Sequence, residues 1–282
     1  SCKACRRACP TGVDMAKMKI EVLAERAARH RIALRDRLIA DLPRLAPFAS
    51  RVAPLANLRN SMALLRRGSQ RLGFATDRKL PAWRRDVFRD AEAANHALAA
   101  TREVLLFADT FNRYFEPENL RAALRVLAAA GYRAVLPRTR GRPICCGRTW
   151  LSAGLLDQAR AEARRTLAAL SGGLPVIGLE PSCLLTLRDE FLSLLPGAEA
   201  RALAARAILL GEFLAQERPS LSLHPWPGVA HVHGHCHQKS HGAFPAALAS
   251  LQLVPELAVK PIAATCCGMA GAFGYHAETQ DV

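Results

Sequence analysis

The chain has 282 residues, half of them hydrophobic, so it is long enough to build two domains that each have a core of their own. It contains no uncharged apolar run of about eighteen residues, which excludes an ordinary membrane-spanning helix. The formal net charge of +15 comes mainly from arginine, but aromatic residues make up only 6% of the chain and do not alternate with the basic ones, so we expect no nucleic-acid partner.

The chain opens with three cysteines whose spacing is typical of an iron-sulfur protein. Cys2, Cys5 and Cys9 are spaced C-x2-C-x3-C, and Pro10 follows directly. This spacing matches the last three cysteines of the bacterial ferredoxin run, in which three thiolates bind one 4Fe-4S cluster and the last cysteine binds a neighbouring cluster. We therefore predict that these three thiols bind 4Fe-4S clusters, and that a missing ligand lies upstream of Ser1 in a longer polypeptide.

Zinc, a disulfide and a redox C-x-x-C motif are the alternatives for this cysteine group. A zinc site would need a second ligand pair nearby, but the next cysteine is Cys145 and His30 stands alone. A disulfide fits poorly with nine clustered cysteines and no secretory leader. A thioredoxin-type motif would follow a strand, whereas Cys2 and Cys5 precede a helical region for which Asp14 is the expected N-cap. Zinc is therefore the second choice.

The pattern from residue 14 to about 95 predicts irregular helices. Apolar side chains recur at steps of three or four residues, and these are Met15, Met18, Val22, Leu34, Leu38 and Leu42. We interpret them as core residues, in helices broken near Pro43, Pro47 and Pro54. Arginines are dense between residues 26 and 89, and this basic face could bind an anionic membrane surface or an acidic redox partner.

After a connector at residues 80–100, short apolar runs alternate with helical patterns. We expect strands at 104–108, 132–136 and 175–179, and helices at 118–130, 151–170 and 184–195. The second strand should end at a C-C-G motif formed by Cys145, Cys146 and Gly147, and the third should lead into Cys183. Such alternation predicts an α/β fold with a mostly parallel sheet covered on both faces.

A similar unit follows from about residue 200. We expect helices at 206–216 and 243–251, and strands at 229–233 and 257–263. The first of these strands should lead into Cys236, and the second into another C-C-G motif formed by Cys266, Cys267 and Gly268. We therefore predict duplicated cysteine-rich C-C-G domains at 101–199 and 200–282, preceded at 1–100 by a ferredoxin-like helical segment and its connector.

The cysteine groups are expected to converge, because each follows a predicted strand and the carboxyl ends of parallel strands form the binding crevice of an open sheet. The candidate metal ligands are Cys145, Cys146, Cys183, Cys236, Cys266 and Cys267. Gly147 and Gly268 would let the backbone approach a bulky centre closely. It stays open whether each half holds its own cluster or both share one iron-sulfur or zinc site.

Three histidines surround Cys236. His233, His235 and His237 alternate along a segment that we expect to be extended, so all three would point to one face. Each imidazole could bind a metal, deliver a proton or hydrogen-bond a thiolate. We predict the last of these roles, in which the histidines support the thiolate ligands without binding the metal.

The two halves resemble the cysteine-rich C-C-G domains of heterodisulfide reductase and of the iron-sulfur subunits of glycolate oxidase and anaerobic glycerol-3-phosphate dehydrogenase. Residues 9–19, 233–239 and 266–275 resemble most closely the fused form, in which an FAD-linked oxidase carries an iron-sulfur tail, as in bacterial D-2-hydroxyglutarate dehydrogenases and related D-lactate dehydrogenases. The pattern departs from the fullest motif at Asp109, which replaces a leading cysteine, and at Thr186, which replaces the second cysteine of a C-x-x-C pair.

The resemblance implies an electron-relay region of a flavin-dependent D-2-hydroxy-acid dehydrogenase. Electrons would pass from FAD, on a domain upstream in the same polypeptide, through iron-sulfur centres to a quinone or an electron-transfer flavoprotein. The chain contains no dinucleotide-binding motif, so substrate oxidation would occur upstream and no catalytic residue is assigned. The resemblance also implies a further cysteine segment downstream. We expect a cytoplasmic protein that makes at most peripheral contact with the inner face of the membrane.

Two other functions stay open. One is an iron-sulfur subunit of the heterodisulfide-reductase or glycolate-oxidase type. The other belongs to a different class, a zinc-stabilised scaffold that binds a partner protein and has no redox activity. Such a scaffold would be colourless and would contain zinc in place of iron.

Overall fold

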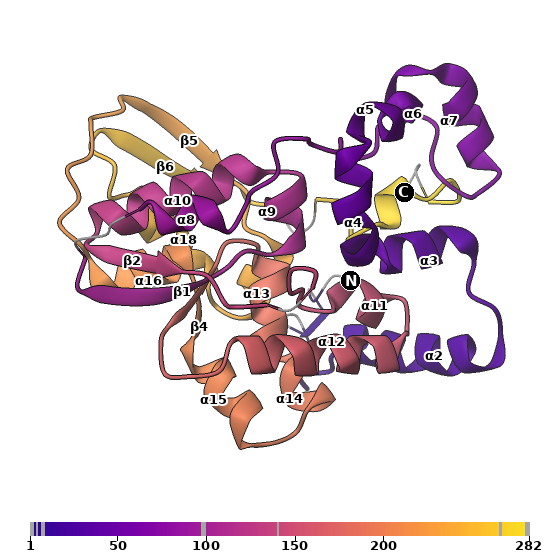
Figure 1. Cartoon of the computed structure of the whole chain (residues 1–282), viewed down its shortest axis with the longest axis horizontal. Coiled ribbons are helices and arrows are strands. Elements are labelled where there is room, and N and C mark those ends of the chain that lie inside the picture. Colours follow the sequence, from indigo (N-terminus) through magenta and orange to yellow (C-terminus); the bar gives the residue numbers. More distant parts are fainter. Residues whose placement is uncertain are drawn as a thin grey trace.

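The computed structural model describes residues 3, 5–6, 9–96, 100–139, 141–264 and 267–279. Two predicted ligands, Cys2 and Cys266, lie outside the described residues. Figure 1 shows a helical region, drawn in indigo and purple, beside an α/β region that holds the strands. The C-terminal segment, in yellow, returns to the helical region.

The helical region consists of short helices joined by tight connections. They are α2 (Met15–Arg29), α3 (Leu34–Ala40), α4 (Leu42–Arg51), α5 (Ala53–Ala56), α6 (Leu58–Ser61) and α7 (Ala63–Gln70). The Asp14 carboxylate accepts the backbone N–H groups of Ala16 and Lys17, which confirms the predicted N-cap. The prediction that Pro47 breaks a helix is wrong, because this residue lies inside α4.

The apolar stripe predicted for α2 is not its buried face. Met15, Met18 and Val22 are 50%, 51% and 68% exposed, whereas Ala16 and Ile20 are buried. The buried face is thus a narrow one centred on a small residue and an isoleucine. The interpretation of the two methionines as core residues is wrong, because α2 turns its Ala16 and Ile20 face toward the rest of the molecule. At Leu23 the helix approaches a neighbouring turn closely.

Gly154 allows that close approach. A Cβ atom at this position would lie 2.4 Å from the backbone carbonyl carbon of Leu23, so only glycine lets α2 lie this near the turn that contains Gly154. Small residues suit a contact of this kind better than long side chains. The leucines of the next predicted stripe, Leu34 and Leu38, are likewise 58% and 38% exposed.

The α/β region is built on a four-stranded parallel sheet in the order β2-β1-β3-β4. Its strands are β1 (Arg102–Phe107), β2 (Tyr132–Val135), β3 (Val176–Gly178) and β4 (Ala207–Leu209). Its helices are α9 (Thr110–Tyr114), α10 (Pro117–Ala129), α11 (Arg148–Ser152), α12 (Leu156–Ala169), α13 (Pro181–Arg188), α14 (Glu190–Leu194), α15 (Ala198–Arg206) and α16 (Leu210–Glu217), with α8 (Ala91–Ala94) in the connector. The predicted α/β class and parallel sheet are confirmed.

Both faces of this sheet are covered. Along β1, Val104 and Leu106 belong to one buried cluster, whereas Leu105 and Phe107 belong to another, as the alternation of side chains along a strand requires. The leucine face of α10 covers the first cluster and is buried at the positions that the sequence predicts, namely Leu120, Leu124 and Leu127. Fully burying one such leucine contributes roughly 1.5–3 kcal/mol.

Two details of this unit differ from the predictions. β2 ends at Val135, earlier than predicted, so Cys145 does not follow the strand directly. A helix was predicted at residues 206–216, but Ala207–Leu209 forms β4, and the helix α16 begins only afterwards. A three-residue apolar strand has no periodicity that separates it from the start of a helix.

The second unit forms a separate two-stranded parallel sheet. It contains β5 (Gly228–Val232), α17 (Cys236–Ser240), α18 (Phe244–Leu251), β6 (Leu257–Pro261) and the 3-10 turn η1 (Phe273–Tyr275). Its strands follow the same β-α-β order as β1 and β2, but the side chains of β5 and β6 are exposed or half-buried. The units therefore share an order of elements and differ in burial.

The C-terminal segment attaches to the helical region. The backbone N–H of Ala75 donates to the carbonyl of Tyr275 at 2.8 Å, and the N–H of Ala277 donates to the carbonyl of Gly73 at the same distance. Arg35 forms an ion pair of 2.8 Å with Glu278. The segment that follows the second C-C-G motif is thus fixed against the helical region, as Figure 1 shows.

Candidate metal-thiolate site

The first C-C-G motif is held by helix α12. The backbone N–H of Cys145 donates to Glu162 Oε1 at 2.9 Å, and the Thr166 hydroxyl donates to the carbonyl of Cys145 at 2.8 Å. Gly147 has a φ of 78°, and a Cβ atom there would lie 3.3 Å from the carbonyl oxygen of Ala159. Glycine is therefore required both for the left-handed turn into α11 and for the close packing on α12.

Three predicted ligands come together at this point. The thiol of Cys146 hydrogen-bonds both the thiol of Cys145 and that of Cys183. All three residues are at most 2% exposed. Cys183 reaches the site from the first turn of α13, where the Glu180 carboxylate caps the helix by accepting the backbone N–H of Ser182. Loops after β2 and β3 thus deliver sulfur to one buried place, as the sequence predicts.

Burial disfavours the charged form of these thiols. The hydrogen bond to Cys146 and burial raise the pKa of Cys145 well above its usual value. The hydrogen bond with Cys146 lowers the pKa of Cys183, but burial and the nearby carboxylates Asp109 and Glu180 raise it to about 12. A thiolate here needs a compensating cation, and a bound metal ion would supply one while releasing the thiol protons.

Two carboxylates that flank the thiols also have unusual surroundings. Asp109 caps α9 by accepting the backbone N–H groups of Phe111 and Asn112, and it is 1% exposed. Burial and the charge of Glu180 raise the pKa of Asp109 to about 6. The fullest C-C-G pattern has a cysteine at the position of Asp109, so the residue keeps the predicted place beside the site. Glu180 carried no signal of its own in the sequence.

The helix of the second unit that begins at Cys236 lies against the helix that contains Cys183. Cys236 is the first residue of α17, and α17 packs against α13, the helix that contains Cys183. Lys239 of α17 donates to the carbonyl of Ala264 at 2.6 Å, which ties the helix to the segment before the second C-C-G motif. Cys267 of that motif is exposed, and Gly268 has the same φ of 78° as Gly147.

The three histidines do not share one extended face, so this expectation is wrong. β5 ends before His233, His235 is the N-cap of α17, and His237 lies inside that helix. The chain turns at Gly234, where a Cβ atom would lie 2.6 Å from the ring of Phe244, and this close packing directs the chain from the strand into the helix.

Each of the two later histidines has a charged neighbour. His237 is buried, and its Nε2 atom lies 3.1 Å from Arg148. His235 lies 3.9 Å from the Glu180 carboxylate, and burial lowers its pKa. These positions put both imidazoles at the edge of the thiol site, and their predicted role as partners of the thiolates stays a prediction.

The N-terminal cysteine loop has the geometry that favours thiolates. The backbone N–H of Cys9 donates to the carbonyl of Cys5 at 2.8 Å, and the Cys9 sulfur lies 3.0 Å from the Thr11 hydroxyl. Hydrogen bonds from Thr11 and from the backbone N–H groups of Val13, Thr11 and Gly12 lower the pKa of Cys9. Several donors directed at one sulfur stabilise its negative charge, as an iron-sulfur ligand requires.

A charged network that no sequence pattern predicts connects this loop to the α/β region. Lys3 is 1% exposed, and its ammonium group forms ion pairs with Asp189 and with Glu190, the latter at 2.8 Å. Asp189 also pairs with Arg6 at 2.8 Å and with Lys17 at 3.0 Å. These partners lie far apart in the chain, so only the fold brings them together.

The described cysteines form no disulfide with one another. Within the described part of the chain, no three or more Cys, His, Asp and Glu side chains are arranged to hold a metal ion. Three buried thiols, those of Cys145, Cys146 and Cys183, nevertheless meet at a place where burial disfavours their charged forms, and thiolates are ligands that soft metal ions prefer.

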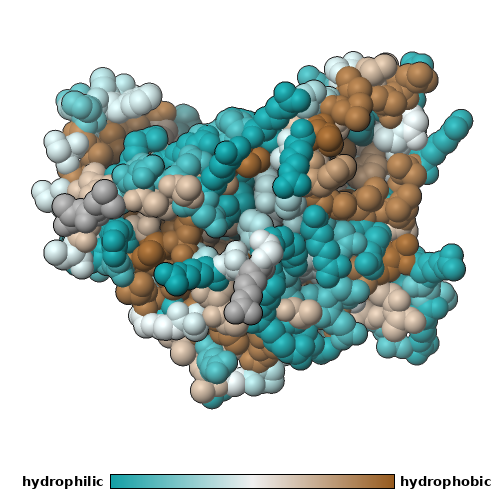
Figure 2. Space-filling view, in the orientation of Figure 1, coloured by the Kyte–Doolittle hydropathy of each residue, from teal (hydrophilic) through white to brown (hydrophobic). Residues whose placement is uncertain are grey.

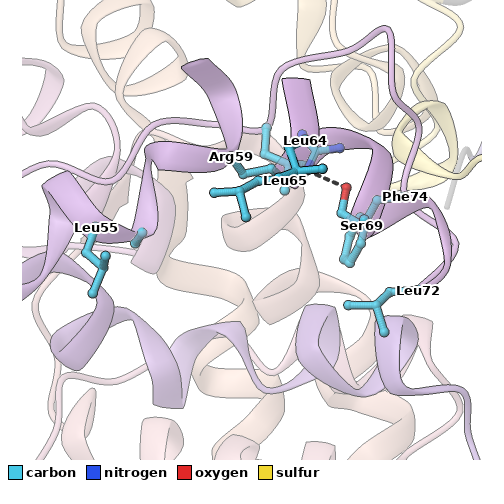
Figure 3. Close-up of a pocket in the computed structure, with 10 residues that line it drawn as sticks. Leu55, Arg59, Leu64, Leu65, Ser69, Leu72 and Phe74 are labelled. Carbon is cyan, nitrogen blue, oxygen red and sulfur yellow. Dashed lines mark hydrogen bonds between the residues drawn. The ribbon is translucent and has the colours of Figure 1, made fainter. Parts of the chain in front are cut away.

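A second notable feature is an apolar groove in the helical region, with a volume of about 590 Å³. It is lined by Leu55, Ala56, Arg59, Leu64, Leu65, Gly68, Ser69, Leu72, Phe74 and Leu80. Figure 3 shows the leucines around it, with Arg59 donating to Ser69 at 2.9 Å. In Figure 2 hydrophobic side chains gather over this part of the molecule. None of the described helices is long and apolar enough to cross a bilayer.

Known proteins resemble the chain along its whole length. It is 25% identical, over all of its residues, to D-2-hydroxyglutarate dehydrogenase of Escherichia coli (strain K12), and 27% identical, again over all of its residues, to the enzyme of the same name from Pseudomonas putida. In each case the chain spans 29% of the length of the relative.

One subunit of another dehydrogenase is also similar. This subunit, from the anaerobic glycerol-3-phosphate dehydrogenase of Escherichia coli (strain K12), is 26% identical over 88% of this chain and 64% of its own length. No protein-family model and no solved structure matches the chain. The resemblance that the cysteine motifs predict is thus confirmed: the chain is similar to one part of the D-2-hydroxyglutarate dehydrogenases and to one subunit of the anaerobic glycerol-3-phosphate dehydrogenase.

Proposed function

We propose that this chain is the electron-relay region of a flavin-dependent D-2-hydroxy-acid dehydrogenase, of the D-2-hydroxyglutarate or D-lactate type. The observation that carries the proposal is the contact of three buried thiols, Cys145, Cys146 and Cys183, in a chain that is similar along its whole length to D-2-hydroxyglutarate dehydrogenases. Substrate oxidation and FAD would belong to another domain of the same enzyme.

The proposed ligands fall into two groups. Cys2 and Cys5 would bind one 4Fe-4S cluster, and Cys9 would bind a neighbouring one. The second group, which would bind iron-sulfur or zinc, consists of Cys145, Cys146, Cys183, Cys236, Cys266 and Cys267. An iron-sulfur centre supplies one-electron storage when it is bound.

The remaining residues of the chain would prepare the site for this role. The core around β1 and β3 excludes water from Cys145, Cys146 and Cys183. Helix α12 fixes the C-C-G backbone through Glu162 and Thr166, so the sulfur atoms need little rearrangement when the oxidation state changes. Fixed surroundings of this kind lower the reorganisation energy of electron transfer.

The same proposal assigns a role to each segment of the chain. Residues 1–100 would form the ferredoxin-type segment and its connector, 101–199 the first C-C-G repeat and 200–282 the second. The sheet of the first unit extends past residue 199, because β4 pairs with β3. The electron acceptor would be a quinone or an electron-transfer flavoprotein.

The test is a metal analysis of the protein purified without oxygen. We expect iron, acid-labile sulfide and an electron paramagnetic resonance signal after reduction. Cys183→Ser should lose part of the iron, whereas Leu187→Val, a control in the same helix at a residue with 0% exposure, should retain it. A colourless wild-type protein that contains zinc and no iron would instead establish the scaffold function.

We also propose that the helical region makes peripheral contact with an anionic membrane surface, at the cytoplasmic face. Between residues 42 and 76 the chain has six arginines and no acidic residue. The same stretch lines the apolar groove, and Leu55 and Leu64 are 68% and 76% exposed. Exposed leucines flanked by arginines are the combination that binds a bilayer carrying negative lipids.

Vesicle flotation tests this contact. We expect the protein to float with vesicles of anionic phospholipid and to float less with neutral ones or at high salt. Leu64→Asp should reduce flotation, whereas Trp226→Ser, which alters a side chain that is 70% exposed in the second unit, should not. Equal flotation of the wild type and Leu64→Asp would contradict the proposal, as would the absence of wild-type binding.

A further inference from the structure

Arg148 occupies a central place that the proposed relay does not yet explain. It follows the first C-C-G motif directly, and its side chain is only 8% exposed. Its backbone N–H donates to the thiol of Cys146. Its guanidinium lies 2.5 Å from Glu190 Oε1 and 3.1 Å from His237 Nε2. One buried cation therefore contacts the thiol site, α14 and α17 together.

The same guanidinium also contacts Thr186, whose hydroxyl lies at 3.3 Å. Thr186 is fully buried and stands in α13, three residues after Cys183. The fullest C-C-G pattern has another cysteine at this position. Where that pattern would add a negatively charged thiolate, this chain has the Thr186 hydroxyl, which accepts a hydrogen bond from the positively charged Arg148.

Glu190 connects Arg148 to the N-terminal cysteine loop. Its Oε1 atom accepts from Arg148 and also lies 2.8 Å from the ammonium group of Lys3. Lys3 is 1% exposed and stands between Cys2 and Cys5 in the sequence. Three buried side chains, Lys3, Glu190 and Arg148, thus bridge the two cysteine groups.

The network around this bridge carries an excess of positive charge. Its cations are Lys3, Arg6, Lys17 and Arg148, and its carboxylates are Asp14, Asp189 and Glu190. Four positive charges face three negative ones in these ion pairs of the described residues. Solvent screens the charges of Arg6 and Lys17, which are 38% and 39% exposed, whereas Arg148 is buried next to Cys146, so its charge is weakly screened and opposes that of the carboxylates Asp109 and Glu180. A positive charge at this position favours the state of a neighbouring thiolate-bound centre that has gained an electron.

We propose that Arg148 is a positioning residue that sets the reduction potential of the centre bound by the C-C-G thiolates and, through Glu190 and Lys3, couples it to the N-terminal cysteine loop. This inference rests on the proposed function, because it requires a redox centre at Cys145, Cys146 and Cys183. It goes further by assigning the control of the potential to a residue that binds no metal.

A purely structural role is the alternative, since Arg148 also joins three helices. The two roles differ in what they predict for the midpoint potential of the C-C-G centre. If Arg148 acts through charge, Arg148→Gln should lower the midpoint potential of the C-C-G centre, Arg148→Lys should restore most of it, and Glu190→Gln should raise it. If Arg148 only holds helices together, each variant disturbs the packing and the shifts have no reason to follow the charge.

The experiment is a redox titration of the iron-loaded protein, followed by electron paramagnetic resonance. For Arg148→Gln we expect a change of about tenfold in the equilibrium between oxidised and reduced centre, which corresponds to about 59 mV for one electron. Arg113→Gln is the matched control, because Arg113 is also 8% exposed but pairs with Asp90 and lies outside the network. Its potential should equal that of the wild type.

The outcomes separate this inference from the proposed function. If the wild type contains no iron, the proposed function fails and the inference fails with it. If the wild type has the expected signals but Arg148→Gln keeps its iron and its potential, only the role of Arg148 is overturned. If Arg148→Gln does not load iron, the other two variants decide. A midpoint potential near that of the wild type for Arg148→Lys, together with a higher one for Glu190→Gln, supports the inference. Midpoint potentials that shift in the same direction in both variants overturn it.

Discussion

The two C-C-G units follow the same order of strand, helix and strand, yet they differ in how deeply they are buried. In the first unit Val104, Leu106 and Ile177 are fully buried, and helices cover both faces of its sheet. In the second unit the strands β5 and β6 are exposed or half-buried along their length. The comparison teaches that a shared motif does not ensure a shared environment, because the first set of thiols lies in a core and Cys267 lies in solvent.

Breaking the ion-pair network between the first unit and the N-terminal loop should give the largest loss of stability. Asp189→Asn leaves Lys3, Arg6 and Lys17 without their shared carboxylate, so we expect it to lower the free energy of unfolding by about 3 kcal/mol. Asp157→Asn is the control, since Asp157 is 95% exposed and pairs with Arg160 at 3.5 Å. Its effect should be close to zero. Urea unfolding of the variants measures both.

The same carboxylate predicts how stability depends on pH. Burial raises the pKa of Asp189, but hydrogen bonds from His241, Lys3 and Lys17 outweigh it and hold the pKa well below its usual range. The stabilisation is therefore complete above the unfolded pKa of about 4 and is lost as the pH falls below that value. Asp189→Asn should flatten the acid limb of the stability curve, and an unchanged limb would contradict the assignment.

The two C-C-G glycines allow a direct comparison of the units. Both have a φ of 78°, but a Cβ atom at Gly147 would lie 3.3 Å from a backbone oxygen, whereas nothing described lies within 4 Å of one at Gly268. We expect Gly268→Ala to cost about 1 kcal/mol from the left-handed backbone alone, and Gly147→Ala to cost about 2 kcal/mol, because it adds the contact with the backbone oxygen. Equal costs, measured by thermal unfolding, would mean that the two motifs have the same surroundings.

The smallest expected effects on stability come from truncating one valine in each unit. Val104 in β1 is 0% exposed and Val229 in β5 is 51% exposed. Truncation to alanine should cost about 2 kcal/mol at Val104, where a cavity forms, and about 0.5 kcal/mol or less at Val229. Denaturant unfolding of the pair checks the difference. A larger cost at Val229 would show that β5 is buried against a surface of a partner.

Sequence reasoning succeeded where a signal is local. The leucine face of α10, the cap at Asp14 and the strands that precede Cys183 and Cys236 all follow from short-range periodicity or from one side chain and its nearest N–H groups. The meeting of Cys145 with Cys183 also follows, because β2 and β3 both pair with β1 in parallel and therefore end at the same edge of the sheet.

It failed where tertiary contacts decide. The exposure of Met15 and Met18 depends on which face of α2 packs against the rest of the molecule, and no pattern within α2 contains that information. The position of His237 depends on packing at Gly234. The bridge through Glu190 joins residues that are far apart in the chain, so it has no spacing to recognise.

The shared oxygen of Glu190 has a consequence for how the molecule is made. Lys3 and Arg6 leave the ribosome long before Asp189 and Glu190, the carboxylates to which they bind. The opening loop therefore stays without its partners until more than half of the chain has been synthesised. Under the proposed function, the machinery that delivers iron to this loop would therefore meet it in two different environments, first on a growing chain and then on a folded one.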